Sequence, residues 1–319
     1  SPYIADCRIS LNQADTGGGV YLYGSTSILE NCLIISNTAE YAGGGISSDF
    51  NEASSLVFNC TISGNTSDDN GGGISCWSTQ HSFFNCLVAN NTSRYGAGIF
   101  GFCVSPYLTF MNCTVVGNTA SHQGGGYLGS KIADPVMTNC ILWNNIPEET
   151  AGIPPQIIFS DIMGGFPGTG NIDEDPLFTT GIYGHYYLSQ TASGQTEDSP
   201  CIDSGSDLSE FICASTLPDP VCLDEMTTRT DQTGDAGLVD MGFHYPVEMP
   251  SCDNTGDVDC NGIITAGDGQ MAFMIALGLL TPDYLEACAA DCNATGDITA
   301  GDAQAIFLAA LGIGTCADG

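Results

Sequence analysis

Apolar residues recur along the first half of the chain in short alternating runs, within a repeat of 25 to 28 residues. Alternation over so few residues is typical of β-strands and not of helices. Three inward columns predict three short strands per turn, each stacked on the turn below at the usual spacing of ~4.8 Å. The pattern therefore predicts a parallel β-helix. The three apolar columns are Ile4, Leu29, Val57, Phe83, Phe110 and Met137; Ile9, Ile34, Ile62, Val88, Val115 and Leu142; and Val20, Ile46, Ile74, Ile99 and Tyr127.

The polar positions of the same repeat predict its corners. Stacked asparagine amides can hydrogen-bond from coil to coil at a bend, and we expect the cysteines to form a small inward ladder. Glycine permits positive φ or a close backbone approach at another bend. The sequons at Asn65 and Asn91 are not expected to carry glycans, because the repeat already explains these residues. The cysteines are Cys7, Cys32, Cys60, Cys86, Cys113 and Cys140; the asparagines are Asn31, Asn59, Asn85, Asn112 and Asn139, then Asn37, Asn65, Asn91, Asn118 and Asn145; the glycine triplets are Gly17–Gly19, Gly43–Gly45, Gly71–Gly73 and Gly124–Gly126, with Gly96-Ala97-Gly98 in the fourth coil.

The repeat blurs after residue 147, where three distinctive segments follow at 170–178, 198–205 and 239–246. Together with the repeat they resemble the closing coils of bacterial pectin-lyase-like β-helix proteins of the choice-of-anchor surface type. The resemblance covers residues 1–247 and implies a mainly β, right-handed parallel β-helix. It is specific for fold and weak for function. Cys201, Cys213 and Cys222 are expected to staple an insertion, with their pairing open.

Two twelve-residue loops after Pro250 match the pattern of a calcium loop, which uses side-chain oxygens at alternate positions and a backbone carbonyl at position 7. The two loops begin at Asp257 and Asp291, and each leads into an apolar segment expected to be helical, at 271–277 and 305–311. We therefore expect two bound calcium ions. The expected ligands are Asp257, Asp259, Asn261, Ile263, Thr265 and Asp268 in the first loop, and Asp291, Asn293, Thr295, Asp297, Thr299 and Asp302 in the second.

Duplicated loops that end in Asp, each followed by a helix, resemble a type I dockerin, so this second domain is expected to span residues 248–319. The resemblance implies a cohesin-like partner, contacted through loop positions 10 and 11. These positions are Ala266-Gly267 and Ala300-Gly301, which lack the hydroxyl groups of familiar cellulosomal dockerins. The partner is therefore expected to differ from a standard cohesin. Cys260, Cys292 and Thr295 depart from the pattern as well. In the alternative interpretation, calcium only folds the domain.

Charge and cysteine content narrow the possible partners. The chain has 37 acidic residues, four basic residues and 16 cysteines, with a net charge of −33. This charge excludes nucleic acids and anionic membranes as partners, because phosphate groups need clustered Lys and Arg. The many cysteines favour an oxidising, extracellular or cell-surface location. The sequence contains no stretch of 18 apolar residues, so no membrane insertion is expected.

The chain could be a polysaccharide-active enzyme, and the positions of its carboxylates test this hypothesis. Glu30 stands alone in its strand column, and Asp49, Glu52, Asp68, Asp69 and Asp134 are expected in solvated loops. His81, His122, His185 and His244 share no metal-ligand spacing. We therefore expect a non-catalytic scaffold or adhesive protein, which could still bind polysaccharide. The alternative, a polysaccharide lyase or glycoside hydrolase, would be favoured by three carboxylates in a cleft formed by residues 148–245.

One outward column of the repeat contains Phe58, Phe84 and Met111. An exposed apolar strand face usually marks an interface. The chain also begins inside a coil, and an open coil leaves strand edges that can pair with another chain. These features predict contact with another copy of the chain, head to tail and into a fibre. In the alternative, the segment 148–245 folds back and covers this face.

Overall fold

The computed structural model describes residues 2–49, 54–77, 81–102, 108–130, 135–214, 220–247, 256–258, 264–279, 289–292, 297–313 and 315–316. The chain divides into two compact units, Ser1–Thr180 with Tyr186–Val247, and Gly181–His185 with Glu248–Gly319. Four stacked sheets lie in the first unit, and the two described α-helices lie in the second.

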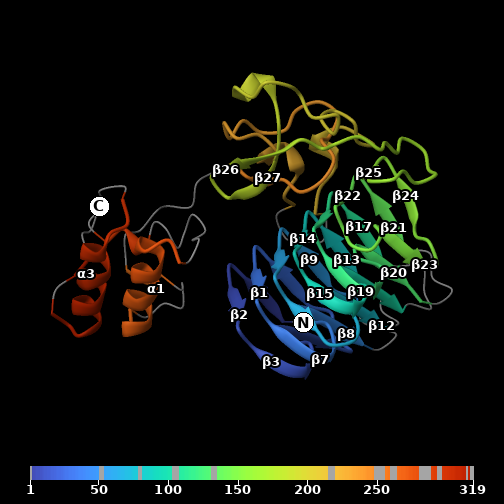
Figure 1. Cartoon of the computed structure of the whole chain (residues 1–319). Helices are drawn as coiled ribbons and strands as arrows, with labels where there is room; N and C mark the ends of the chain where they lie inside the picture. Colours follow the sequence, from blue (N-terminus) through green and yellow to red (C-terminus); the bar gives the residue numbers. More distant parts are fainter. Residues whose placement is uncertain are drawn as a thin grey trace. The chain divides into compact units, whose positions relative to one another are not determined.

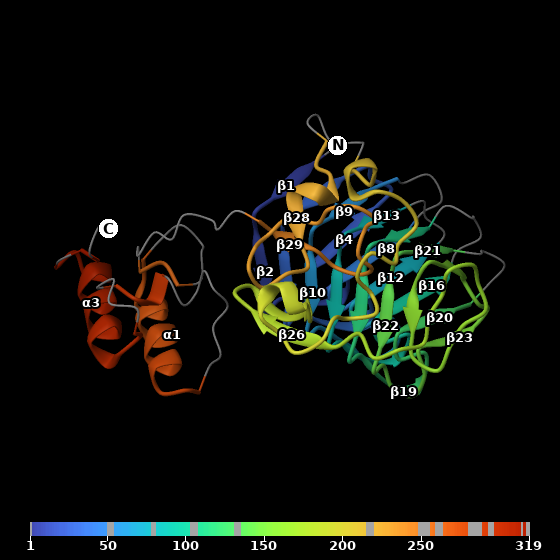
Figure 2. The same ribbon diagram turned by 90° about the horizontal axis from the view of Figure 1, so that it is seen from above.

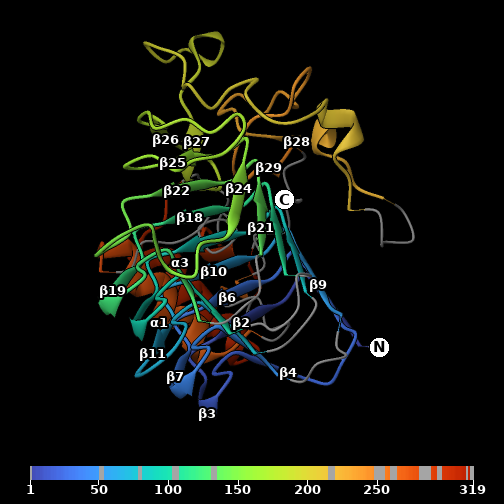
Figure 3. The ribbon, with the colours of Figure 1, turned by 90° about the vertical axis from the view of Figure 1, so that its right-hand side faces the viewer.

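Residues 3–162 wind through four parallel sheets, here called A to D, as a parallel β-helix (Figures 1 and 3). Sheet A contains β1 (Tyr3–Ala5), β5 (Ile28–Glu30), β9 (Leu56–Phe58), β13 (Ser82–Phe84), β17 (Thr109–Met111), β21 (Val136–Thr138) and β24 (Gln156–Ile158). Sheet B contains β2 (Arg8–Ser10), β6 (Leu33–Ile35), β10 (Thr61–Ser63), β14 (Leu87–Ala89), β18 (Thr114–Val116), β22 (Ile141–Trp143) and β25 (Asp161–Ile162). Sheet C contains β3 (Gln13–Thr16), β7 (Thr38–Ala42), β11 (Thr66–Ser67), β15 (Thr92–Tyr95) and β19 (Thr119–Gln123). Sheet D contains β4 (Val20–Tyr23), β8 (Ile46–Asp49), β12 (Ile74–Trp77), β16 (Ile99–Phe102), β20 (Tyr127–Gly129) and β23 (Thr150–Gly152).

The core of the β-helix consists of the three predicted apolar columns, which the structure confirms as inward. Equivalent residues pair in register, as Ile34 does with Ile62 and Ile62 with Val88. The rings of Phe83 and Phe110 stack with centroids 4.9 Å apart. Each coil therefore places its apolar side chains directly on those of the coil before it.

The predicted cysteine ladder is confirmed from the second coil onward, where its thiols are buried in the same core, whereas Cys7 is exposed. Burial raises the pKa values of the thiols of Cys60, Cys113 and Cys140, because it removes water from around the charged thiolate. The protonated thiol of Cys140 donates to the backbone carbonyl of Thr138 at 3.3 Å. These three thiols are therefore neutral and pack as small apolar side chains.

Sheet C corrects the prediction of three strands per turn, because each full turn contains a fourth strand. Its inward side chains are small, and include Ala39, Ser67, Ser93 and Ala120, which are all buried. A column of alanine and serine carries no apolar signal in the sequence, so this strand could not be recognised from hydrophobic alternation. The side chains are small where the chain runs from the asparagine ladder to the glycine triplets.

The corners of the coils confirm the predicted roles of asparagine and glycine. The asparagine before each ladder cysteine adopts positive φ, for example 49° at Asn85 and 50° at Asn112. The second asparagine column points inward, and Asn65 and Asn91 are fully buried, which leaves no room for a glycan at either sequon. The third glycine of each triplet makes this ladder fit, since a Cβ on Gly73 would lie 2.9 Å from Nδ2 of Asn91.

A closing segment, residues 186–247, covers the outer faces of sheets A and B (Figure 2). The exposed interface predicted at Phe58, Phe84 and Met111 is therefore corrected: Phe58 is 1 % and Phe84 6 % exposed, and Met111 is half-buried. These side chains pack in one cluster with residues of the closing segment, because an apolar column gains most by leaving water. The covering residues are Ile212, Ala214, Leu223, Met226 and Val239.

The closing segment is short of regular structure and is held by specific bonds. A disulfide joins Cys213 and Cys222, while Cys201 remains a buried free thiol. Corner asparagines of the β-helix bind its backbone: Nδ2 of Asn85 donates to the carbonyl of His244 at 2.8 Å. The elements in and next to this segment are β26 (Phe178–Gly181), β27 (Gly184–Leu188), β28 (Met226–Thr227), β29 (Tyr245–Pro246), and the 3-10 helices η1 (Thr191–Ser193), η2 (Ser209–Phe211) and η3 (Leu223–Glu225).

The second unit contains helices α1 (Ala266–Ala276) and α3 (Ala300–Ala310), which pack on each other. Both helices begin before the predicted apolar segments, because a threonine caps each of them. The disulfide Cys292–Cys316 lies in their small shared core. The other buried residues of this core are Val258, Ala272, Ile275, Ala290, Ala303 and Ile306.

Candidate functional site

The two predicted calcium loops share one local geometry at their C-terminal ends. Thr265 caps α1, and Oδ2 of Asp268 accepts hydrogen bonds from the amide N and from Oγ1 of Thr265, both at 2.8 Å. Thr299 and Asp302 repeat this arrangement at α3, with distances of 2.9 and 2.7 Å. This is a reciprocal capping box, in which the third helical residue returns a bond to the capping residue. Loop positions 9 and 12 therefore fix where each helix begins.

Burial and charge make these carboxylates unusual. Asp268 and Asp302 are fully buried, and Asp291 is 8 % exposed. Residues 248–319 contain 11 acidic residues and no lysine, arginine or histidine. A buried carboxylate is costly without a compensating positive charge. The chemistry of this segment, hard oxygen donors without basic side chains, fits a bound divalent cation such as calcium.

Part of the predicted ligand set lies outside the described residues. This applies to Asp259, Asn261 and Ile263 in the first loop and to Asn293 and Thr295 in the second. Among the residues that are described, no three His, Cys, Asp or Glu side chains gather as a metal site would require. Calcium binding therefore remains a prediction. It is supported by the burial of Asp268, Asp291 and Asp302 and by the helix caps at Thr265 and Thr299. Asp257 and Asp297 add negative charge to the two loops.

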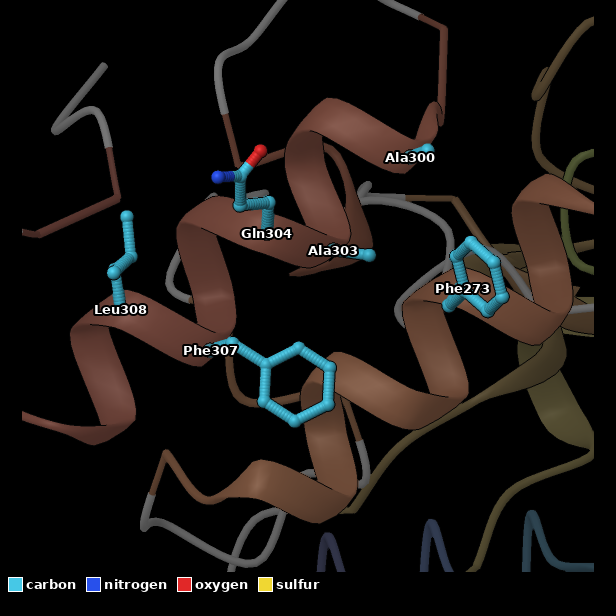
Figure 4. A pocket seen from close by; sticks show the side chains of 6 residues that line it. All are labelled: Phe273, Ala300, Ala303, Gln304, Phe307 and Leu308. Atoms are coloured by element: carbon cyan, nitrogen blue, oxygen red, sulfur yellow. The ribbon is translucent and has the colours of Figure 1, made fainter.

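The predicted partner-binding residues Ala266, Gly267, Ala300 and Gly301 are exposed at the beginnings of α1 and α3. Beside them lies a pocket of about 350 Å³ between the two helices (Figure 4). Gly269 of α1 allows Phe307 of α3 to pack against it, since a Cβ at residue 269 would lie 2.6 Å from the ring of Phe307. The pocket is lined by Phe273, Ala300, Ala303, Gln304, Phe307 and Leu308.

Exposed apolar side chains recur in equivalent pairs on the two helices. Phe273 and Phe307 are 44 % and 39 % exposed, and Leu277 and Leu311 are 56 % and 71 % exposed. Each pair occupies the same position in the two copies of the duplicated sequence. Exposed apolar residues that cluster on one face are typical of an interaction surface. We call these four residues, together with the pocket, the helical face.

The closing segment brings acidic residues together, as the enzyme hypothesis requires, but it buries them. Asp240 is 3 % and Asp235 7 % exposed. Oδ2 of Asp235 accepts from the amide of Asp240 at 3.0 Å and lies 2.9 Å from Nε2 of His244, while Oδ1 of Asp240 accepts from the amide of Asp203 at 2.8 Å. Burial raises the pKa of Asp240 to about 6. These side chains hold the segment together, and a polymeric substrate cannot reach them.

A buried thiol–carboxyl pair has the same structural character. Cys201 donates its thiol hydrogen to Oδ2 of Asp161 at 3.3 Å, and both residues are fully buried. Desolvation raises the pKa of Asp161 to about 6, against the opposing effect of this hydrogen bond. The pair ties the closing segment to the last strand of sheet B.

The sequence pattern did not predict one group of residues on sheet D. Asp49, expected in a loop, is the last residue of β8 and lies in register between Tyr23 of β4 and Trp77 of β12. Tyr21 and Tyr23 are 46 % and 57 % exposed. The signal was present as aromatic pairs two positions apart, Tyr21 with Tyr23 and Phe100 with Phe102, and as Trp77 at the end of β12. It became visible only when the register aligned strands that are far apart in the sequence.

Comparison with known proteins supports the fold of the first unit. Residues 1–154 match the family described as the right-handed β-helix region. With the stacked sheets, this establishes a right-handed parallel β-helix. The match covers slightly less than half of the chain and does not extend to the closing segment or to the helices. Neither the curated proteins nor the solved structures gave a match. No helix among the described residues has the length and apolar character needed to cross a membrane.

Proposed function

We propose that the chain is a non-catalytic extracellular scaffold or adhesive protein, in which the β-helix is a rigid body and residues 248–319 form a dockerin-like, calcium-dependent attachment module. One observation carries this proposal. Asp268 and Asp302 occupy equivalent positions in a duplicated loop and are fully buried, in a segment, residues 248–319, without a basic side chain. Calcium supplies the missing positive charge at such positions.

Metal binding is coupled to attachment through the helix caps. Asp268 belongs both to the expected ligand set and to the capping box that begins α1. Ligation of this carboxylate restricts Thr265 and therefore the exposed Ala266 and Gly267 that follow it. The same holds for Asp302 and α3. A metal-free loop would leave the first turn of each helix less fixed, and the helical face less well ordered.

The helical face is apolar, so its partner presents a complementary apolar surface. A cohesin-like module or another copy of this chain fits that description. The pairs Phe273 with Phe307 and Leu277 with Leu311 are large enough to fill pockets in a partner. The disulfides Cys213–Cys222 and Cys292–Cys316 support the oxidising location that such a role implies.

Calorimetry and sedimentation test this function together. The chain is titrated with calcium after chelation, and its self-association and binding to a panel of cohesin modules are measured with and without calcium. Asp268→Asn and Asp302→Asn should each remove one calcium site and weaken association, whereas Asp224→Asn, an exposed acid of the first unit, should change neither. Calcium binding without any calcium-dependent association would leave the metal a folding role only. Absence of calcium binding would reject the proposal.

The enzyme alternative has its own test. The chain is incubated with neutral and acidic polysaccharides, and new reducing ends or unsaturated products are measured. We expect none, because the buried carboxylates of the closing segment are engaged in structural bonds. Product formation that is lost in a variant of an exposed acid would establish the alternative.

A further inference from the structure

Four side chains on the outer face of sheet D form a compact group that the proposed function does not use. Tyr23, Asp49 and Trp77 are register partners on the adjacent parallel strands β4, β8 and β12, so they follow one another at the strand spacing of about 4.8 Å. Tyr21 lies two residues before Tyr23 on the same face, with ring centroids 5.9 Å apart. A carboxylate therefore lies between aromatic rings.

The indole ring is held in place before any ligand binds. Nε1 of Trp77 donates to Oγ of Ser75 at 2.9 Å. On the side of the later coils, the ring of Phe102 covers Trp77 with centroids 4.5 Å apart. On the side of the earlier coils, Asp49 and then Tyr23 follow Trp77 in register. A ring fixed in this way loses little conformational entropy when it binds a ligand.

Charge decides what this group binds. The face of an aromatic ring attracts cations, and a neighbouring carboxylate adds a full negative charge. The chain carries a net charge of −33, which attracts cations and repels anions over longer distances. The same chemistry already occurs within the molecule, since the guanidinium of Arg94 lies 5.2 Å from the ring centroid of Tyr95 on sheet C.

The four side chains are accessible to a cationic ligand. Tyr21 and Tyr23 are 46 % and 57 % exposed, and Asp49 and Trp77 are half-buried. Desolvation raises the pKa of Tyr21, and the negative charge of Asp49 raises it further. A ligand can therefore contact rings and carboxylate at once.

We propose that Tyr21, Tyr23, Asp49 and Trp77 form a binding site for an organic ammonium group, with a quaternary trimethylammonium as the preferred form. A quaternary ammonium has no strongly held water to lose, and its methyl groups match the faces of the rings. This site is independent of calcium and of the helical face.

The test uses the full chain with calcium present and isothermal titration with choline. Its uncharged isostere, 3,3-dimethylbutan-1-ol, is the matched control ligand. Two or three cation–π contacts beside a carboxylate predict a dissociation constant of roughly 1–10 mM for choline. The alcohol should bind at least about fivefold more weakly, because it keeps the shape and loses the charge.

Variants locate the binding. Asp49→Asn and Tyr23→Leu should each weaken choline binding at least about threefold. Asp15→Asn removes the same charge from an exposed position on β3 and should leave binding unchanged. A peptide with one trimethyl-lysine tests the same chemistry on a protein, and the tighter of peptide and choline identifies the source of the group. Equal binding of choline and the alcohol, unchanged binding in Asp49→Asn, or no binding up to about 50 mM choline would each overturn the proposal.

Discussion

Replacing Asn91 by alanine tests whether hydrogen bonds or mere space-filling hold the inward asparagine ladder together. Asn91 lies in the middle of the ladder and is fully buried. Its Nδ2 donates to the carbonyl of Ile62 and to Oδ1 of Asn118, both at 2.9 Å. Its Oδ1 accepts from the amide N and from Nδ2 of Asn65, at 2.9 and 3.1 Å.

Truncation at Cβ removes all four hydrogen bonds, but some of the partner groups keep another hydrogen bond and one does not. Nδ2 of Asn65 keeps its bond to Ile34, and Oδ1 of Asn118 keeps the bond from the amide of residue 91. The amide N–H of Asn65 loses its acceptor inside the coil. One stranded buried donor costs about 1–3 kcal/mol, and each further bond lost costs about 1 kcal/mol. On that basis, the free energy of unfolding should fall by about 4–6 kcal/mol.

Thermal and urea unfolding followed by circular dichroism, with calcium present, measures this loss. For a unit of this size, about 4 kcal/mol corresponds to a decrease in Tm of roughly 8–16 °C. Asn90→Gly is the matched control, because Asn90 is exposed with φ of 55°, and glycine adopts that conformation easily. It should change stability by less than about 1 kcal/mol. A loss below about 1 kcal/mol for Asn91→Ala would refute the hydrogen-bond argument.

Three further predictions concern calcium, pH and the closing segment. Calorimetry should find two calcium sites, with tighter binding at the first loop, because Asp257, Asp259 and Asp268 supply three carboxylates against two from Asp291 and Asp302; tighter binding that is lost in Asp302→Asn would contradict this order. Burial raises the pKa of Glu149 from 4.5 to about 7. The contribution of Glu149 to stability is therefore fully present below pH 4.5 and is lost as the pH rises through 7, by up to roughly 3 kcal/mol. The free energy of unfolding, measured between about pH 5 and 8, should show this decrease in the parent chain and not in Glu149→Gln. Phe84→Ser should loosen the closing segment and speed its limited proteolysis, whereas Thr119→Ser, at an exposed position of β19, should leave the cleavage rate unchanged.

The repeat made the β-helix predictable because its signal is redundant. Each inward position recurs from coil to coil, so one unusual residue such as Tyr127 does not hide the column that contains Ile46, Ile74 and Ile99. The strands of sheet C escaped prediction because their inward residues are alanine and serine. Their positions depend on the asparagine ladder and the glycine bends, not on hydrophobic alternation.

The covered face shows why an outward apolar column is ambiguous in the sequence. Phe58 and Phe84 pack with Leu223 and Val239, which lie more than 130 residues later in the chain. The closing segment has no repeat and few regular elements, so its position could not be deduced from local patterns. The group around Asp49 illustrates the same difficulty, because its residues meet only through the register of strands.

The bonds between the closing segment and the corner asparagines also limit how the length of the chain can change in evolution. Duplication of a whole coil is the simplest way to lengthen a solenoid, because each coil packs only on its neighbours. Here the amide of Ser206 donates to Asn139, Nδ2 of Asn112 donates to the carbonyl of Asp240, and Asn85 binds His244. An additional coil between Asn85 and Asn139 would move these attachment points apart by about 4.8 Å. The closing segment could not bind all of them at once, so the number of coils in this part of the molecule is fixed by a segment outside the repeat.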